Sequence, residues 1–363
     1  MARDAMTPKQ RFTAYARGEA IDRLPCAPIV GNTAARVLGV KVSDFRGNGK
    51  LIAAAQVAAY RRFGYDVMRI FTDLYVQAEA MGARVHYPED ETAYLAEPAI
   101  DSVEKIDSLK PADPRKDGNL PHHLEAMARA VDAVGSEVAV NGALTGPFTT
   151  ASFLIGTDRL ARLMLRNPEA VHRLCEVSLQ SALAYAEAIL EVGCAPSLTD
   201  AMCSSTVISA RQFQEFGQPY LRRLVDFLHA RDRAVTLHIC GKTRPIWSAM
   251  CDTGADCLSI DNAADLAEAK ASVGDRVRLM GNIPPADVML LGSPEQVRTD
   301  VRRCVRQAHD NPKGFIVATG CSLPVETPLA NIDAMVDAVR EIGWPVNAAE
   351  LIGAAELENP CTA

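Results

Sequence analysis

Short apolar runs of the kind found in β-strands alternate along this chain with longer segments whose apolar residues recur at helical spacing. The runs predicted to be strands are 25–30, 66–71, 137–140, 196–199, 234–238, 256–260, 276–280 and 314–317. The clearest helical stretches are 51–63, 121–134, 169–191, 210–230, 294–309 and 329–342. Such alternation predicts a parallel sheet covered by helices.

Eight strands separated by helices favour a closed (β/α)8 TIM barrel. The alternative, an open doubly wound sheet, usually carries a G-x-G-x-x-G turn after its first strand, and this sequence has none. Residues 1–20, with a predicted helix at 8–17, form an N-terminal extension that packs against the barrel. Residues 75–120 form a long excursion after the second strand. Because no Gly/Ser-rich linker divides the chain, residues 1–363 are predicted to be a single domain.

Composition narrows the classes of function. The formal net charge of -7 and the absence of a Lys/Arg-rich run argue against a nucleic-acid partner. No apolar stretch approaches the roughly 18 residues of a membrane span, and the N-terminus lacks the apolar core of a signal peptide. We therefore expect a cytoplasmic protein whose 10 cysteines are reduced. The oligomeric state stays open, with a homodimer among the candidates.

Polar residues stand where the predicted strands should end. They are Asp73, Asn141, Asp200, His238, Asp261, Asn282 and Cys321. In a barrel of parallel strands the carboxyl ends converge on one rim, where active sites are built. The sequence therefore predicts a functional site at this rim.

The segment AVTLHICG holds the most informative pair of these side chains. Alternation along an extended backbone places His238 and Cys240 on the same side, about 6–7 Å apart along the chain. The segment GFIVATGC ends a second buried strand and brings Cys321 to the same rim. One imidazole and two thiolates suit Zn²⁺ and leave a fourth position open, as in catalytic zinc sites. The alternative is that these are ordinary core residues, because cysteine is often buried.

Three motifs carry a resemblance to a known family. HICGKT at 238–243, GDRVRLMGNI at 274–283 and GCSLPVETP at 320–328 resemble the uroporphyrinogen decarboxylase superfamily, and more narrowly its methyl-corrinoid:coenzyme M methyltransferase branch. The resemblance extends over nearly the whole chain. It implies that His238, Cys240 and Cys321 bind zinc, which activates an acceptor, typically a thiol, for methyl transfer. It also implies that the open end of the barrel docks a corrinoid-binding protein.

Four further residues are candidates for catalytic roles. Asp200 either orients a ligand or substrate or caps a turn, and Asp261 either accepts a hydrogen bond from the His238 imidazole or caps a helix. Asn282 resembles the family's G-N motif near the site. Glu79, in a segment that resembles the family's E-A-x-G stretch, is either a fourth ligand, a base or a solvated helix residue.

Other functions remain as alternatives. The decarboxylase itself has an Arg-rich M-R-Q-A-G-R loop after its first strand, whereas the equivalent GNTAARVLG here has only Arg36. A methyltransferase that takes its methyl group from a methoxyaromatic is a second candidate, and a binding protein without turnover is a third. The chain lacks the D-x-H-x-x-G motif of cobalamin binding, so the corrinoid (methylcobalamin) must be carried by a partner. The small-molecule methyl donor or acceptor stays open among thiols such as coenzyme M, pterins, methyl halides and methoxyaromatics.

Overall fold

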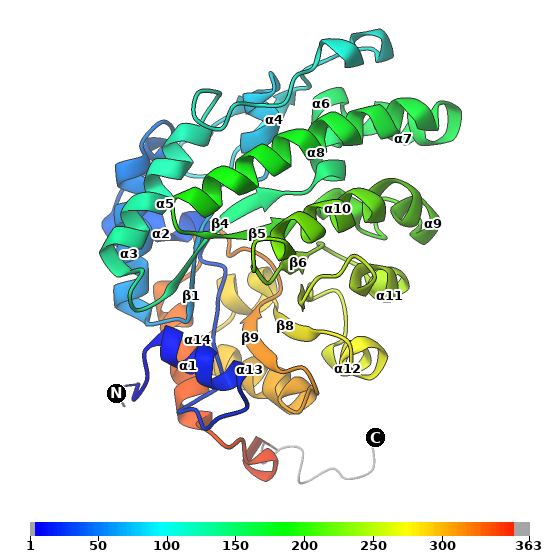
Figure 1. The fold of residues 1–363 in the computed structure, drawn as a ribbon. Helices are drawn as coiled ribbons and strands as arrows, with labels where there is room; N and C mark the ends of the chain where they lie inside the picture. Colours follow the sequence, from blue (N-terminus) through cyan, green and yellow to red (C-terminus); the bar gives the residue numbers. More distant parts are fainter. Residues whose placement is uncertain (1–3, 352–363) are drawn as a thin grey trace.

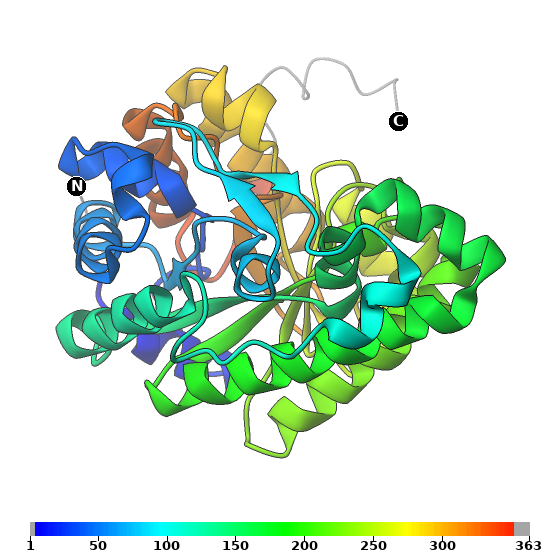
Figure 2. The ribbon, with the colours of Figure 1, turned by 90° about the horizontal axis from the view of Figure 1, so that it is seen from above.

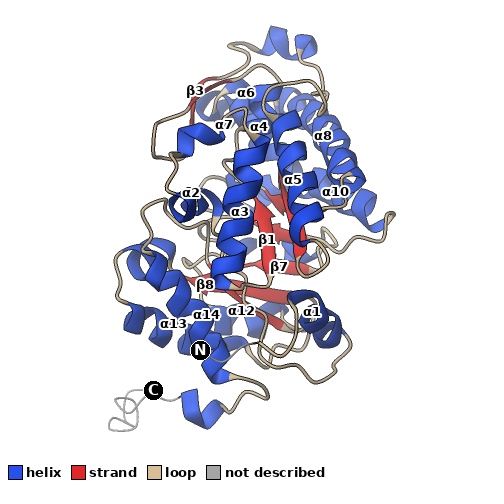
Figure 3. Ribbon diagram, turned by 90° about the vertical axis from the view of Figure 1, so that its left-hand side faces the viewer, coloured by secondary structure: helices blue, strands red, loops and turns tan. Residues whose placement is uncertain are grey.

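A curled sheet of seven parallel strands forms the centre of the computed structural model, which describes residues 4–351. The strands are β1 (Val67–Ile70), β4 (Ala139–Thr145), β5 (Ala195–Thr199), β6 (Thr236–His238), β7 (Cys257–Ser259), β8 (Arg278–Ile283) and β9 (Phe315–Thr319), adjacent in that order. Figures 1 and 3 show the sheet surrounded by helices. The predicted TIM-like architecture is confirmed. Residues 1–3 and 352–363 of the predicted single domain lie outside the described residues.

Helices connect consecutive strands and cover the outer face of the sheet. Those of the barrel and its N-terminal extension are α1 (Pro8–Ala16), α2 (Ala34–Leu38), α3 (Gly49–Phe63), α5 (Leu120–Val134), α6 (Pro147–Ile155), α7 (Thr157–Arg166), α8 (Pro168–Glu191), α9 (Ala210–Gln212), α10 (Gln218–His229), α11 (Trp247–Cys251), α12 (Leu266–Val273), α13 (Pro294–Ala308) and α14 (Leu329–Ile342). The inner face of the sheet surrounds a small apolar cluster of its own. Ala27, Cys257, Met280, Ile316 and Ala318 form this cluster.

Three predicted elements need correction. The third predicted strand, 137–140, is β4 at 139–145, so Asn141 lies within the strand and not at its end. The predicted helix 210–230 is interrupted by a π turn at Phe213–Gly217. Pro219, in the first turn of α10, has no N–H to donate to the carbonyl four residues earlier, so a regular α-helix cannot run through this point.

The first predicted strand, 25–30, is also different from expectation. Among the described residues it makes one isolated bridge, from Cys26 to Val317 of β9, and Val30 at its end already has helical dihedral angles. On its other side Asp66 N–H donates to the Cys26 carbonyl at 2.7 Å. Pro25 and Pro28 lack the N–H groups that a continuous ladder needs. This segment therefore closes the barrel between β9 and β1 without forming a regular eighth strand.

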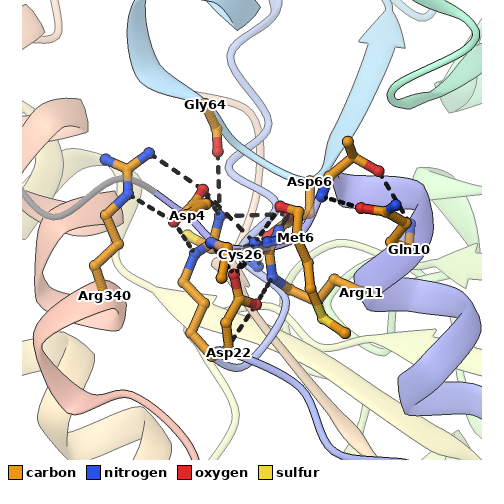
Figure 4. A network of polar contacts seen from close by, with 12 residues as sticks. Asp4, Met6, Gln10, Arg11, Asp22, Cys26, Gly64, Asp66 and Arg340 are labelled. Atoms are coloured by element: carbon orange, nitrogen blue, oxygen red, sulfur yellow. Dashed lines mark hydrogen bonds and ion pairs between the residues drawn. The ribbon is translucent and has the colours of Figure 1, made fainter.

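A buried ionic network strengthens this closure at the amino end of β1 (Figure 4). Asp66 has no exposed side-chain surface and pairs with Arg11 and Arg23, which are also buried. It also accepts the N–H of Cys26 at 2.6 Å. Asp22 holds Arg11 at 2.6 Å, and Asp4 holds Arg23 at 2.8 Å. The N-terminal extension is thereby fixed to the barrel.

The two predicted additions to the barrel lie at opposite ends. Helix α1 is at the amino end, where Lys9 N–H donates to the Glu137 carbonyl just before β4, at 3.0 Å. The excursion after β1 contains α4 (Val76–Ala80) and an antiparallel hairpin of β2 (Arg84–His86) and β3 (Tyr94–Glu97). Figure 2 shows this hairpin crossing over one end of the barrel. Among the described helices, none combines the length and apolar character needed to cross a membrane.

Replacing Asp66 with Asn tests the closure. The change leaves two buried guanidinium groups without their shared anion, so we expect the free energy of unfolding to fall by about 3–5 kcal/mol. Equilibrium urea unfolding measures this loss. Asp107→Asn is the matched control, because Asp107 pairs with Arg173 while 82% exposed, and such pairs contribute about 1 kcal/mol or less. Equal losses in the two variants would contradict a special role for Asp66.

Candidate metal centre

His238, Cys240 and Cys321 meet at the carboxyl end of the barrel. His238 is the last residue of β6, and Cys240 lies two residues beyond it; Cys321 follows β9 by two residues. The imidazole nitrogen and the two sulfurs all lie within 4.8 Å of one another. The predicted convergence of these three side chains from two separate strands is confirmed.

The His238 ring has a fixed orientation. Its Nδ1 lies 3.1 Å from the Ser259 carbonyl oxygen and 3.2 Å from the Ser259 hydroxyl. Because a carbonyl oxygen only accepts, Nδ1 carries the proton and donates it to Ser259. Nε2 therefore presents its lone pair towards the Cys240 sulfur, 3.3 Å away. A metal-binding imidazole is usually held in this way, by a hydrogen bond from its other nitrogen.

The sulfurs of Cys240 and Cys321 lie close enough for each to affect the ionisation of the other. The Cys240 thiol donates a hydrogen bond to the Cys321 sulfur, which lowers the pKa of Cys321 well below its usual range. The same hydrogen bond, together with burial, raises the pKa of Cys240. Because a cysteine binds a metal as its thiolate, a divalent cation at this point would displace any proton that the pair retains.

Two glycines allow the cysteine loops to pack closely. Gly241, after Cys240, has a φ of +70°, and a Cβ atom there would lie 2.8 Å from the Thr206 hydroxyl. Gly320, before Cys321, packs so tightly that a Cβ atom would lie 2.5 Å from the Asn262 nitrogen. Any larger residue at either position would displace the adjoining sulfur.

Asp261 supports the Cys240 loop and does not contact the imidazole. Its Oδ2 accepts the N–H of Gly241 at 2.8 Å, and its Oδ1 accepts the N–H of Ala263 at 2.8 Å. The predicted hydrogen bond from His238 to Asp261 is therefore wrong, because Ser259, on the neighbouring strand, already accepts from that ring. The sequence alone does not identify Ser259, because only the pairing of β6 with β7 places it in register with His238.

Asn282 also lies behind this loop, near the end of β8. It is buried, and its amide donates to the carbonyls of Asp261 and Ala264 at 3.1 and 2.6 Å. Its side-chain oxygen accepts from Arg303 of α13 at 3.3 Å. Asn282 thus holds the 261–264 turn in place, and its side-chain hydrogen bonds are made within the protein.

Asp200 is completely buried and serves the N-terminus of α6. It accepts the Thr149 N–H at 2.7 Å and the Thr149 hydroxyl at 2.5 Å, and the Phe148 N–H lies 3.4 Å away. Burial raises its pKa to about 6. These contacts favour the capping alternative, although the helix that it caps precedes it in the chain.

Glu79 belongs to a different polar group, beneath the β2–β3 hairpin. Its Oε2 accepts from the Tyr87 hydroxyl and the Asn119 amide, both at 2.8 Å. Among the described residues the group of potential metal ligands contains His238, Cys240 and Cys321 but not Glu79. Asp73 lies near Glu79, and burial raises its pKa to about 6.

A small cavity of about 60 Å³ opens beside the three candidate ligands. Its walls are Ile29, Arg69, Phe71, Leu74, Ala143, Thr199, His238, Cys240, Cys321 and Ser322. Arg69 was not foreseen from the sequence, because it lies inside an apolar run that indicates only a strand.

The donor set fits a zinc ion. Bonds of about 2.0 Å to nitrogen and 2.3 Å to sulfur place tetrahedral ligands roughly 3.5–3.8 Å apart. The 3.3 Å between His238 Nε2 and Cys240 Sγ is close to that separation. The three residues could therefore hold Zn²⁺ with small adjustments, and the cavity would adjoin its open fourth position.

Curated relatives at modest identity match almost the whole chain. The methylcobamide:CoM methyltransferase MtaA of Methanosarcina barkeri is 29% identical over 92% of this chain and 98% of its own. A methylated-thiol–coenzyme M methyltransferase of Methanosarcina mazei is 27% identical over 94% of this chain and 91% of its own. A uroporphyrinogen decarboxylase of Pseudoalteromonas atlantica is also 27% identical, over 81% of this chain and 83% of its own.

A solved structure and a family model agree with these relatives. The structure described as a methyltransferase from Methanosarcina mazei superposes with a TM-score of 0.84, at 25% identity, over 93% of this chain and 99% of its own. The family model described as uroporphyrinogen decarboxylase (URO-D) matches residues 7–342. Because the match covers most of the chain, this protein belongs to the uroporphyrinogen decarboxylase family and is an enzyme of that family.

Proposed function

We propose that this protein is a zinc-dependent methyltransferase that moves a methyl group between a corrinoid protein and a small thiol. The observation that supports this most strongly is the meeting of one imidazole and two thiols beside a small cavity. The relatives named as coenzyme M methyltransferases, which cover nearly the whole chain, point the same way.

In this proposal His238, Cys240 and Cys321 hold the zinc. Bound Zn²⁺ lowers the pKa of a thiol at its fourth position, so that a thiolate is available near neutral pH. Ser259 fixes the imidazole, and Asp261 fixes the loop that carries Cys240. Ile29, Phe71 and Leu74 line the cavity with apolar surface that keeps water away from the sulfur.

The group transfer balances without an oxidant or reductant. The acceptor thiol gives its proton to solvent, and the thiolate sulfur attacks the methyl carbon of methyl-Co(III). A C–S bond forms as the Co–C bond breaks, and cobalt keeps the electron pair and becomes Co(I). The corrinoid would be brought to the carboxyl end of the barrel by a separate protein.

A metal-free decarboxylase is a less favoured candidate, considered because decarboxylases are also among the relatives. Such an enzyme would need several cations for the carboxylates of a porphyrinogen. Arg36, in the loop where the family resemblance places them, donates to the Thr327 carbonyl at 3.0 Å and lies 3.8 Å from Glu326. It is therefore already partnered, which favours methyl transfer.

Zinc content tests the ligand set. We expect about one equivalent of zinc per chain in the purified protein. Cys240→Ala and Cys321→Ala should each lose most of it, because two remaining ligands hold zinc weakly. Elemental analysis measures the content, and Cys251→Ala, in α11 outside the cluster, is the control. Full zinc content in both ligand variants would refute this set.

The support from Asp261 can be measured separately. Asp261→Ala frees the N–H of Gly241 and loosens the Cys240 loop, so we expect zinc affinity to fall about 10–100-fold. Competition with a chelator gives the affinity. Asp265→Ala is a matched control, because Asp265 is nearby but caps α12 by accepting the Glu268 N–H at 2.8 Å. A fall of similar size in both variants would mean that the effect is general loosening.

Methyl transfer itself is followed with free methylcobalamin and a short thiol. Formation of Co(I), read from its absorbance, should require zinc. His238→Ala should slow it by more than the roughly 10–100-fold that loss of a supporting residue costs, and Cys251→Ala should not. Equal rates in zinc-loaded and zinc-stripped protein would overturn the proposal.

A further inference from the structure

The two cysteine loops of the candidate metal centre rest on one turn, formed by residues 261–264. The carboxylate of Asp261 accepts the N–H of Gly241, in the first loop, at 2.8 Å. Gly320, in the second loop, packs so closely on the turn that a Cβ atom there would lie 2.5 Å from the Asn262 nitrogen. A displacement of this turn would therefore move both sulfurs.

The side-chain amide of Asn282 holds this turn at both ends. Its Nδ2 donates to the carbonyls of Asp261 and Ala264 at 3.1 and 2.6 Å. If the amide turned by 180°, its oxygen would face those two carbonyl oxygens, which only accept. The orientation that holds the turn is therefore favoured by donors at Oδ1. Arg303 of α13 donates there at 3.3 Å, and the thiol of Cys304, a weaker donor, lies 3.8 Å away.

The guanidinium of Arg303 is held in one orientation by its other contacts. Its Nε and Nη2 donate to the two carboxylate oxygens of Asp300, one turn earlier on α13, at 2.7 and 3.0 Å. Its Nη1 donates to the side-chain oxygen of Gln307 at 2.8 Å. Because a guanidinium is planar and rigid, these contacts aim the second hydrogen of Nη2 at Asn282.

Arg298, on the same helix, provides a comparison. Its side chain is 24% exposed and that of Arg303 is 30% exposed, so the two are similarly buried. Each pairs with a carboxylate, but the partner of Arg298 is Glu341 of α14, at 2.5 Å, on the side away from the metal centre. Burial and charge are thus alike in the two arginines, and the contact with Asn282 is what distinguishes Arg303.

We propose that Arg303 is a positioning residue for the metal centre, which acts from the outer helix α13 through Asn282 and the 261–264 turn. The inference rests on the proposed function, in which Cys240 and Cys321 bind zinc. Each of these cysteines lies two residues beyond the end of its strand, so the separation of the sulfurs depends on what supports their loops. Loss of the guanidinium frees the amide to turn and loosens this support, while every ligand remains in the chain.

Zinc affinity is the first test, measured by competition with a chelator. Arg303→Met keeps most of the apolar stem and removes every donor, so we expect the affinity to fall about 3–30-fold, the range for residues that act on a site through others. Arg303→Lys retains one donor group and should recover part of the loss. Arg298→Met is the matched control and should keep the wild-type affinity. Urea unfolding shows whether each variant is folded, and wild-type affinity in folded Arg303→Met would overturn the proposal.

A double-mutant cycle tests the route. If Arg303 acts through the turn that Asp261 begins, the two side chains belong to one chain of contacts, and their effects on zinc affinity are not additive. Arg303→Met combined with Asp261→Ala should then lose clearly less affinity than the product of the two separate losses. Arg298→Met combined with Asp261→Ala should lose no more than Asp261→Ala alone. Multiplicative losses in the first pair would mean that Arg303 acts by another route, against the proposal.

Two further measurements respond to the geometry of the site and not to general stability. The visible absorption of Co²⁺ bound in place of zinc reports the arrangement of its ligands, and it should change in Arg303→Met but not in Arg298→Met. Hydrogen exchange of the Gly241 N–H, followed by mass spectrometry of zinc-free protein, should be faster in Arg303→Met alone. An unchanged spectrum together with unchanged exchange would refute the positioning role.

These measurements also separate the inference from the proposed function. Exchange at Gly241 that depends on Arg303 supports the positioning role even if no methyl transfer is ever detected. If methyl transfer proceeds but zinc affinity, the Co²⁺ spectrum and amide exchange are all the same in Arg303→Met and wild type, the proposed function survives and the positioning role does not.

Discussion

Hydrogen bonds between neighbouring parallel strands determine where every residue of the candidate site lies. The ladder from β6 through β7 and β8 to β9 places His238 beside Ser259, and Ile283 beside Thr319. Its curl then brings Cys321 back towards Cys240, although 81 positions separate them in the sequence. Because the strands run in one direction, the loops that follow them share one end of the barrel. The imidazole, the two sulfurs and the cavity all depend on this constraint.

The parts of this site that the sequence predicted are those governed by local backbone periodicity. Alternation was sufficient to pair His238 with Cys240, and the position of Cys321 at the end of a buried run was sufficient to bring it to the same rim. The strand 137–140 was placed too early because Asn141 and Gly142 interrupt its apolar pattern, although the strand continues through them. Asn141 points into the barrel, and Gly142 packs so closely against the outer helices that it has no room for a side chain. The residue types at these two positions therefore follow from their surroundings and not from the apolar pattern of a strand.

The remaining errors concern contacts between segments far apart in the chain. The sequence left Asp261 either to the imidazole or to a cap; it supports Gly241 and Ala263, and only the β6–β7 register shows that Ser259 accepts from the ring. Arg69 was missed because an arginine within a strand pattern does not reveal which face it occupies or whether an acid lies opposite. The irregular closing segment at 25–30 could have been suspected from Pro25 and Pro28, whose missing N–H groups interrupt a ladder.

The two ends of the barrel carry their charges in different ways. At the amino end Asp66 and two other aspartates neutralise Arg11 and Arg23, and one of them, Asp4, also pairs with Arg340 of α14 near the end of the chain. At the carboxyl end no carboxylate among residues 4–351 pairs with Arg69, and the cysteines are held by loops rather than by ion pairs. The candidate metal centre and the ionic network that closes the barrel thus lie at opposite ends and share few side chains. Substitutions around the cavity can therefore accumulate over evolution and allow new substrates, while the ionic network that closes the barrel is unchanged.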